Sequence, residues 1–311
     1  MEHHIFQALK KTCLVEDIAK SQYTRCGRTD KGVNAMGNVC SLWVRQASNY
    51  CQMLNHCLPP DIRMLAYAEV SPHFDARFSC IYREYKYFFC QGQMDIKRIE
   101  SACRKLIGLH DFRNFCKKDD SSMPDEDGEQ NFMRRIFNFS VEPVHINQSD
   151  PHLSMWMCVI RGSAFLWHQV RCMMAVLFLI GRGEDEESVI DLLFDTEKLP
   201  DQRPNYEIAA ENGLILSECG FDDVQWAQSA VAGDVETYKV FLKQFDEAAV
   251  AMCISEVMMR QYAQRDWTGN EAGDKWTDIV ESVTKARRKQ KVDDSSVIRK
   301  AAEGAKKREV K

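Results

Sequence analysis

The spacing of apolar residues along the chain predicts strands and helices in an irregular order. Apolar side chains recur at helical spacing over residues 4–15 and 95–107, whereas residues 62–70 alternate and residues 82–90 are rich in aromatic side chains, as in strands. Further strands are expected at 38–45, 132–144, 153–160, 214–218 and 221–226, the last two as a hairpin, and further helices at 49–58, 167–180, 184–194 and from 229 onward. Strands and helices without strict strand–helix–strand alternation favour an α+β fold over a doubly wound one.

Charge is distributed unevenly along the chain of 311 residues, which is 45% apolar and so can bury a core in one large or two small domains. The formal net charge is −5, yet residues 284–311 hold 11 basic and 4 acidic side chains, a net of +7, and the rest of the chain carries −12. Acidic runs at 119–129 and 184–187 are typical of solvated loops or helix starts. A surface that binds a polyanion would therefore have to be a local basic cleft.

The 13 cysteines show no spacing typical of a disulfide framework or a zinc site. Most lie in apolar or periodic stretches, where cysteine behaves as a small buried hydrophobe. The polar start of the chain lacks the apolar stretch of a secretory signal, and the most apolar run, 173–180, is too short to span a bilayer. These observations predict a soluble intracellular protein with reduced thiols, no metal site and no membrane association.

The segment from Gly27 to Gly32, Gly-Arg-Thr-Asp-Lys-Gly, places the Asp30 carboxylate between two cations and two glycines. Arg28 and Lys31 would favour the ionised carboxylate, and the glycines would let the turn present it to a ligand. A nucleophilic aspartate needs both properties. Taken alone, the same residues also suit an ordinary surface turn, in which Asp bonds its own backbone and Gly takes a positive φ.

A wider match supports the first interpretation, because the run GRTDKGVNA at 27–35 resembles the active-site motif of the TruA family of tRNA pseudouridine synthases. The resemblance implies that Asp30 is the catalytic nucleophile. It also implies that Arg28 holds or displaces the target nucleotide, or clamps a phosphate, with Thr29 and Lys31 beside it in the substrate site.

Three further segments match the same family in the expected order. Residues 74–87 resemble its second motif, which implies that Tyr85 contacts the target base. A flipped uracil needs a flat ring on which to stack. Arg83 lies on the same face of the strand as Tyr85. Residues 106–115 resemble a third motif. The run GSAFLWHQVR at 162–171 resembles a fourth, which implies that Arg171 pairs with Asp30 and that His168 lies at the substrate. An arginine can hold a carboxylate through a bidentate pair.

The resemblance implies a pseudouridine synthase fold of two α+β halves that share a largely antiparallel sheet with a central cleft. It assigns residues 1–92 to a catalytic subdomain and 93–228 to a second one, followed by a helical extension at 229–283 and a basic, disordered tail at 284–311. The family's first strand has no counterpart here, since the match starts on the following helix. The segments at 203–209 and 214–226 look most like the eukaryotic enzymes that modify tRNA positions 38 and 39.

The function implied is the isomerisation of uridine to pseudouridine in the anticodon stem-loop of tRNA. No cofactor is expected, because the reaction involves no net redox change or group transfer. A homodimer is compatible with this interpretation, and a nuclear or cytoplasmic location is expected. The basic run at 285–291 suits a nuclear localisation signal, a phosphate anchor or a solvated tail.

Two other functions stay open at this point. A nucleosidase would also attack near C1′ of the ribose, although glycosidic hydrolysis usually uses a second, acidic carboxyl group, and none stands near Asp30 in the sequence. A catalytically inactive tRNA-binding homologue is the second alternative, because the family's first strand is not matched. Detection of free uracil would favour the former, and tRNA binding without isomerisation the latter.

Overall fold

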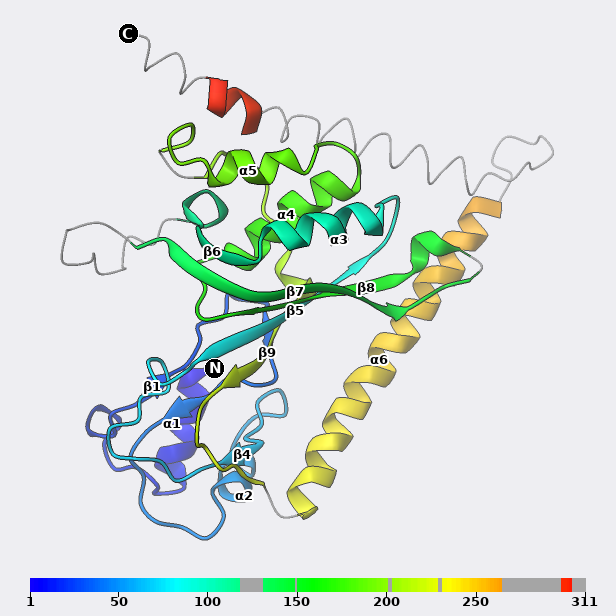
Figure 1. The fold of residues 1–311 in the computed structure, drawn as a ribbon. Helices are drawn as coiled ribbons and strands as arrows, with labels where there is room; N and C mark the ends of the chain where they lie inside the picture. Colours follow the sequence, from blue (N-terminus) through cyan, green and yellow to red (C-terminus); the bar gives the residue numbers. More distant parts are fainter. Residues whose placement is uncertain (118–130, 149, 201–202, 229–230, 265–297, 304–311) are drawn as a thin grey trace. The chain divides into compact units, whose positions relative to one another are not determined.

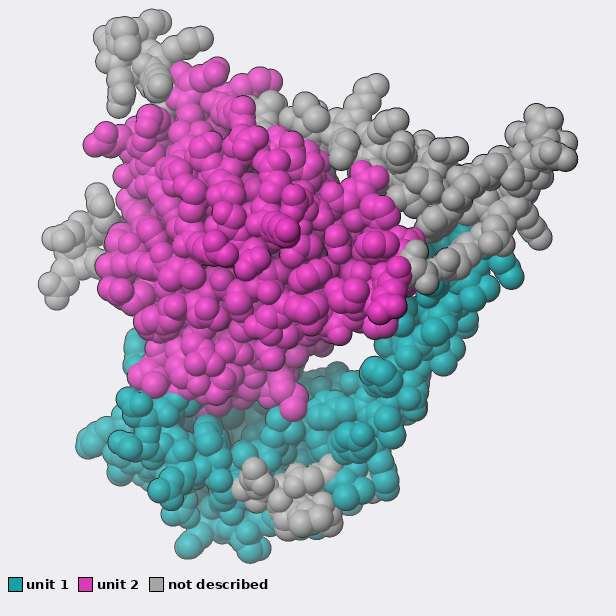
Figure 2. All heavy atoms as spheres, turned by 45° about the vertical axis from the view of Figure 1, so that its right-hand side comes forward, with its two compact units in different colours: residues 1–25, 40–79, 221–283 teal, residues 26–39, 80–220, 284–311 magenta. Residues whose placement is uncertain are grey.

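A computed structural model describes residues 1–117, 131–148, 150–200, 203–228, 231–264 and 298–303 of the chain. The chain divides into two compact units, each assembled from three separate stretches (Figure 2). Unit 1 comprises residues 1–25, 40–79 and 221–283, and unit 2 comprises residues 26–39, 80–220 and 284–311. The expected subdomain boundaries after residues 92 and 228 stay a prediction.

Unit 2 is built on a six-stranded sheet in the order β2–β9–β5–β8–β7–β6 (Figure 1). The strands are β2 (Asn34–Ala35), β9 (Leu214–Gly220), β5 (Tyr82–Cys90), β8 (Met155–Gly162), β7 (Met133–His145) and β6 (Gly108–Asp111). β2 runs parallel to β9, and the other neighbouring pairs are antiparallel. The strand expected at 82–90 and the strand pair expected at 132–144 and 153–160 are confirmed, as is the α+β fold class.

Three helices lie on one face of this sheet: α3 (Ile96–Lys105), α4 (Gln169–Gly181) and α5 (Ser188–Phe194) (Figure 1). α4 is buried along nearly its whole length, and its Phe178 ring lies 5.8 Å from the ring of Tyr87 on β5. The helix was expected to start at residue 167, yet it starts at Gln169 because His168 has a left-handed backbone with φ of 62°. This irregular start directs the first turn of α4 towards the candidate site.

The expected hairpin of 214–218 with 221–226 is wrong. β9 pairs instead with β5 on one side, and on the other side its residues 215 and 216 pair with β2. The close approach of β2 depends on Gly37, since a Cβ atom there would lie 2.5 Å from the carbonyl oxygen of Ser217. The next strand after β9 is β10 (Ala227–Gln228), which pairs with β4 (Ala66–Tyr67) within unit 1.

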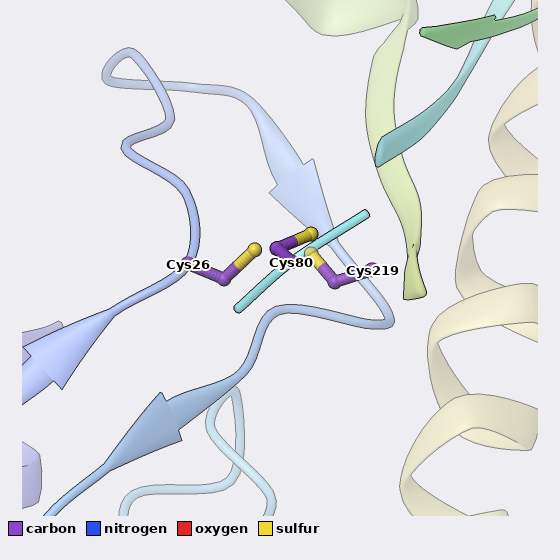
Figure 3. Close-up of side chains that lie close together, drawn as sticks. All are labelled: Cys26, Cys80 and Cys219. Carbon is purple, nitrogen blue, oxygen red and sulfur yellow. The ribbon is translucent and has the colours of Figure 1, made fainter. Parts of the chain in front are cut away.

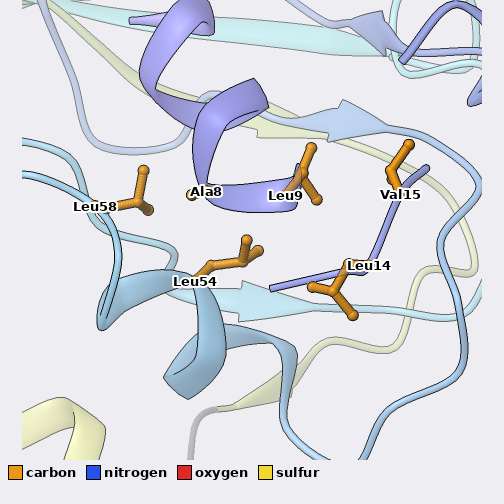
Figure 4. Close-up of a cluster of buried hydrophobic side chains, with 6 residues drawn as sticks. All are labelled: Ala8, Leu9, Leu14, Val15, Leu54 and Leu58. Carbon is orange, nitrogen blue, oxygen red and sulfur yellow. The ribbon is translucent and has the colours of Figure 1, made fainter. Parts of the chain in front are cut away.

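Unit 1 is a small helical and loop-rich body around one apolar cluster. Its elements are α1 (Glu2–Lys11), β1 (Thr24–Arg25), β3 (Cys40–Ser41), α2 (Tyr50–Asn55), β4, β10 and α6 (Val231–Gln264). Side chains of α1, α2 and their adjoining turns form the cluster, which consists of Ala8, Leu9, Leu14, Val15, Leu54 and Leu58 (Figure 4). The helices expected at 4–15 and 49–58 are confirmed in place but are shorter, and the long strands expected at 38–45 and 62–70 reduce to two-residue strands.

Two of the expected polar segments lie largely outside the described residues. One is the acidic loop at 119–130. The other is the basic tail from residue 284, which includes the run at 285–291. Within that tail, the described residues 298–303 are helical. Among the helices that the structure describes, none combines the length and the apolar character required to cross a membrane.

Candidate active site

The loop that carries Asp30 leaves β1 and returns to β3, and its residues 26–39 belong to unit 2. The amide of Val33 donates to the carbonyl oxygen of Asp30 (3.1 Å), and Gly32 has φ of 88°, so the turn takes the form that the two glycines suggested. The Asn38 side chain spans the base of the loop, since its oxygen accepts from the amide of Gly27 and its nitrogen donates to the Gly27 carbonyl, both at 3.2 Å.

The carboxylate of Asp30 contacts three side chains from the start of α4 and the residues just before it. Nη1 of Arg171 donates to Oδ2 at 3.1 Å, Nε2 of His168 lies 3.1 Å from the same oxygen, and Nε1 of Trp167 donates to Oδ1 at 3.2 Å. The Asp30 side chain stays 24% exposed. The carboxylate therefore accepts from Arg171 and from the Trp167 ring and lies beside the His168 ring, while it still reaches solvent.

Arg171 forms the expected ion pair, although the pair is not bidentate. The side chain is 10% exposed, and its other donors bind different acceptors: Nη2 donates to Oε2 of Glu211 (3.0 Å) and Nε donates to the carbonyl oxygen of Ala209 (2.7 Å). The guanidinium thus joins two carboxylates from distant parts of the sequence. A planar fork with all three of its nitrogens engaged has little freedom to move.

Glu211 is a site residue that the sequence did not reveal. It opens the short helix η4 (Glu211–Gly213) ahead of β9, and nothing in its own neighbourhood marks it as a partner of Arg171. Its side chain lies against Gly32 of the Asp30 turn, where a Cβ atom would come within 2.9 Å of the Glu211 Cγ. Gly32 therefore provides the positive φ and also the room for the second carboxylate.

His168 lies at the site as expected. Its left-handed backbone turns the ring towards Asp30, and burial lowers the pKa of the imidazole from its ordinary 6.5 in spite of the nearby carboxylate. The lowered pKa favours the neutral ring, whose Nε2 lies beside the Asp30 carboxylate.

Tyr85 and Arg83 lie on the buried face of β5. The Tyr85 ring is 8% exposed and meets the ring of Phe165 edge-on, with centroids 5.0 Å apart; burial raises the pKa of its hydroxyl well above the ordinary value. Arg83 donates to the carbonyl oxygens of Cys26 and Ser163, at 3.0 Å in each case. Arg83 thus ties two of the motif segments together, and a base could stack on Tyr85 only after Phe165 has moved. The substrate roles of both residues stay predictions.

The cations next to Asp30 in the sequence point elsewhere. Arg28 and Lys31 are exposed and Thr29 is half-buried, and within the described chain neither cation forms an ion pair with Asp30. The positive charge at the carboxylate therefore comes from Arg171, 141 residues further along the chain. Exposed arginine and lysine side chains beside the site are instead suited to phosphate oxygens.

Trp167 is a second residue that the sequence analysis passed over, although it stands directly before His168 in a recognised motif. Its indole is 41% exposed, donates to Asp30 and lies below the ammonium group of Lys117, which is 4.6 Å from the ring centroid. A flat, half-exposed ring beside the carboxylate offers a stacking surface that Tyr85 does not present in this structure.

Comparison with known proteins places the chain among tRNA pseudouridine synthases. A family described as tRNA pseudouridine synthase matches residues 102–222. The chain is 44% identical to the tRNA pseudouridine(38/39) synthase of Homo sapiens over 255 residues, which cover 73% of this chain and 51% of that protein. It is 39% identical to the enzyme of the same description from Saccharomyces cerevisiae, over 74% of this chain and 53% of that one. The chain thus spans about half the length of these relatives.

A third relative is covered more completely. The probable tRNA pseudouridine synthase tag-124 of Caenorhabditis elegans is 35% identical over 276 residues, which cover 78% of this chain and 68% of that protein. The family match at residues 102–222 includes Arg171, which lies in the same unit of the fold as Asp30 and Tyr85. This chain belongs to the TruA-type family of tRNA pseudouridine synthases.

Proposed function

We propose that this chain isomerises uridine to pseudouridine in tRNA, at positions 38 and 39 of the anticodon stem-loop, with Asp30 as the nucleophile. One observation carries the proposal: Arg171 holds the Asp30 carboxylate at 3.1 Å while that carboxylate remains partly exposed to solvent. The positions are those printed in the names of the human and yeast relatives.

The net reaction breaks the N1–C1′ and C5–H bonds of the uridine and forms the C5–C1′ and N1–H bonds. The Asp30 carboxylate attacks C1′ of the ribose or C6 of the uracil, and the N1–C1′ bond breaks; elimination through a glycal is a third route. The base then turns, C5 joins C1′, the bond between Asp30 and the substrate breaks to free the carboxylate, the proton on C5 leaves, and N1 gains a proton, so that product and substrate have the same composition. No external oxidant, reductant or group donor enters this balance.

The surrounding residues would each support one part of this sequence. Arg171 and the N–H groups of His168 and Trp167 orient the carboxylate, and they would stabilise the anion whenever it is released from an adduct. The exposed Arg28 and Lys31 would contact phosphates of the flipped nucleotide. Trp167, or Tyr85 after Phe165 moves, would stack on the uracil.

Tritium release from tRNA labelled at C5 of uridine tests the proposal directly. The chain is compared with Asp30→Asn, which keeps the side-chain shape, and with Asp61→Asn, an exposed carboxylate remote in sequence from the motifs. We expect release from the wild type and from Asp61→Asn, and a loss of at least about 1,000-fold in Asp30→Asn, as is usual when a nucleophile is removed.

Four further measurements on the same samples complete the test. Free uracil in place of pseudouridine would indicate a nucleosidase, and tRNA binding without tritium release would indicate an inactive binding protein; either result contradicts the proposal. Mapping of the product by nuclease digestion and mass spectrometry reports the modified positions. Light scattering of the protein, with and without tRNA, tests the proposal that it acts as a homodimer.

A further inference from the structure

Three cysteines of unit 2 lie together within the fold. Cys26 begins the loop that carries Asp30, Cys80 lies just before β5, and Cys219 lies in β9, and their side chains converge from these separate segments (Figure 3). All three Sγ atoms lie within 4.8 Å of one another. The residues are free thiols that are 4%, 9% and 8% exposed, respectively. We call this group the thiol cluster.

The size of the thiol cluster suits a metal ion. The distances between the sulfurs are at most 4.8 Å. In a triangle with sides of that length, each sulfur would lie about 2.8 Å from the centre, and zinc–thiolate bonds are about 2.3 Å long. An inward movement of about 0.5 Å or less per sulfur would complete the bonds. Rotation of side chains by small angles provides a movement of this size without any change in the backbone.

The charge of Arg83 favours thiolates at this place, whereas the neighbouring thiols and burial raise the pKa of the Cys219 thiol. Arg83 is buried beside the thiol cluster, where its Nε and Nη2 donate to the carbonyl oxygen of Cys26 at 3.3 and 3.0 Å. A guanidinium next to a sulfur stabilises the negatively charged form, which is the form that binds metals. Three thiolates and a divalent ion carry one net negative charge, and the Arg83 guanidinium balances it.

We propose that Cys26, Cys80 and Cys219 bind one thiophilic metal ion, Zn²⁺ or Cu⁺, through three thiolate sulfurs. Soft sulfur ligands select these ions over Mg²⁺ and Ca²⁺, which take oxygen ligands. Binding converts three thiols into three thiolates and releases three protons to the solvent, with no change in oxidation state. Zn²⁺ would add a fourth ligand such as water, whereas Cu⁺ is satisfied by three sulfurs.

The ion would act on the structure and not in the reaction. It would join the start of the Asp30 loop to the segment before β5 and to β9. β5 carries Tyr85, and β9 follows Glu211; the two strands are neighbours in the sheet. Closing these three distant segments with one ion restricts the unfolded chain and stabilises the folded one. The sequence analysis expected no metal site because the three cysteines are far apart along the chain, and ligand spacing cannot show such a site.

Metal titration of the full-length chain tests the proposal without reference to isomerase activity. Protein kept reduced with a phosphine is stripped of metal, and Zn²⁺ or Cu⁺ is added in separate experiments. The variants are Cys26→Ala, Cys80→Ala and Cys219→Ala, and the matched control is Cys103→Ala in α3, because Cys103 is also a buried thiol, 1% exposed, but lies outside the cluster. Circular dichroism confirms that each variant is folded.

We expect one equivalent of Zn²⁺ or Cu⁺ in the wild type and in Cys103→Ala, and affinity at least about tenfold weaker in each cluster variant. X-ray absorption of the zinc-loaded protein should show three sulfur neighbours at about 2.3 Å. The melting temperature of the wild type should rise on loading and fall on chelation, a measurement that needs no variant.

Three results would overturn the proposal: binding of neither ion at one equivalent, binding that survives all three cluster substitutions, or binding that Cys103→Ala weakens equally. A disulfide within the thiol cluster in freshly reduced protein would overturn it as well, because a disulfide leaves too few thiolates for the ion.

Discussion

The replacement of Arg171 by methionine tests the central feature of the site. Methionine keeps most of the apolar stem but removes the three donors that bind Asp30, Glu211 and the carbonyl oxygen of Ala209. The two carboxylates would then remain close to each other without the cation between them. Their exposed fractions, 24% for Asp30 and 46% for Glu211, determine how much of this loss water can replace.

The magnitude follows from those exposures. Breaking a buried ion pair costs about 3–5 kcal/mol, whereas an exposed one contributes about 0–1 kcal/mol. The Asp30 pair lies between these limits at about 2 kcal/mol, and the half-exposed Glu211 pair contributes about 0.5 kcal/mol. The lost hydrogen bond to Ala209 adds about 1 kcal/mol. We therefore expect Arg171→Met to lower the free energy of unfolding by about 3–4 kcal/mol, a large share of the 5–15 kcal/mol typical of a folded protein.

A double-mutant cycle isolates the Asp30 pair. Urea unfolding is measured for the wild type, Arg171→Met, Asp30→Asn and the double variant, and we expect a coupling energy of about 1–2 kcal/mol. The matched cycle with Glu211→Gln should give about 0.5 kcal/mol, because that carboxylate is better hydrated. A coupling between residues 171 and 30 that is zero within error, or smaller than the coupling between 171 and 211, would refute the reasoning.

Three other substitutions test the remaining parts of the site and fold. Burial lowers the pKa of His168 from 6.5, so the unfolded chain accepts a proton more readily than the folded one, and stability that is fully present above pH 6.5 is lost as the pH falls. The free energy of unfolding of His168→Asn should therefore change less between about pH 7.5 and 5.5 than that of the wild type. An equal change in both proteins contradicts the assignment. Gly37→Ala should lower the free energy of unfolding by about 2–3 kcal/mol, since its methyl group would overlap the Ser217 carbonyl; a fully stable variant in urea unfolding would show that β2 does not pack this tightly. Arg28→Gln should reduce the salt dependence of tRNA binding by about one unit of slope with little effect on stability, and an unchanged slope in filter binding would exclude a phosphate contact.

The elements that the sequence predicted correctly are those with long, regular patterns. β5, β7, β8 and α3 each have enough residues for a period to be recognised, and the Asp95 cap marks the start of α3. β3 and β4 did not extend over the expected ranges because each pairs with a single two-residue partner, which limits its length. The incorrect prediction of a hairpin after β9 has a similar cause. β9 pairs with β2 on the side away from β5, and β2 is too short to be recognised from the spacing of its apolar residues.

The residue types that carry chemistry were determined by the sequence itself: Asp30 on its glycine turn, Arg171 and His168 in one motif, and Tyr85 in another. The tertiary structure decided which of these groups meet. The charge next to Asp30 comes from Arg171 and not from its neighbours Arg28 and Lys31, since a side chain's direction depends on its backbone and its packing. The contacts of Glu211 and Trp167 and the convergence of the three thiols in unit 2 likewise depend on distances between remote segments, which only the folded chain defines.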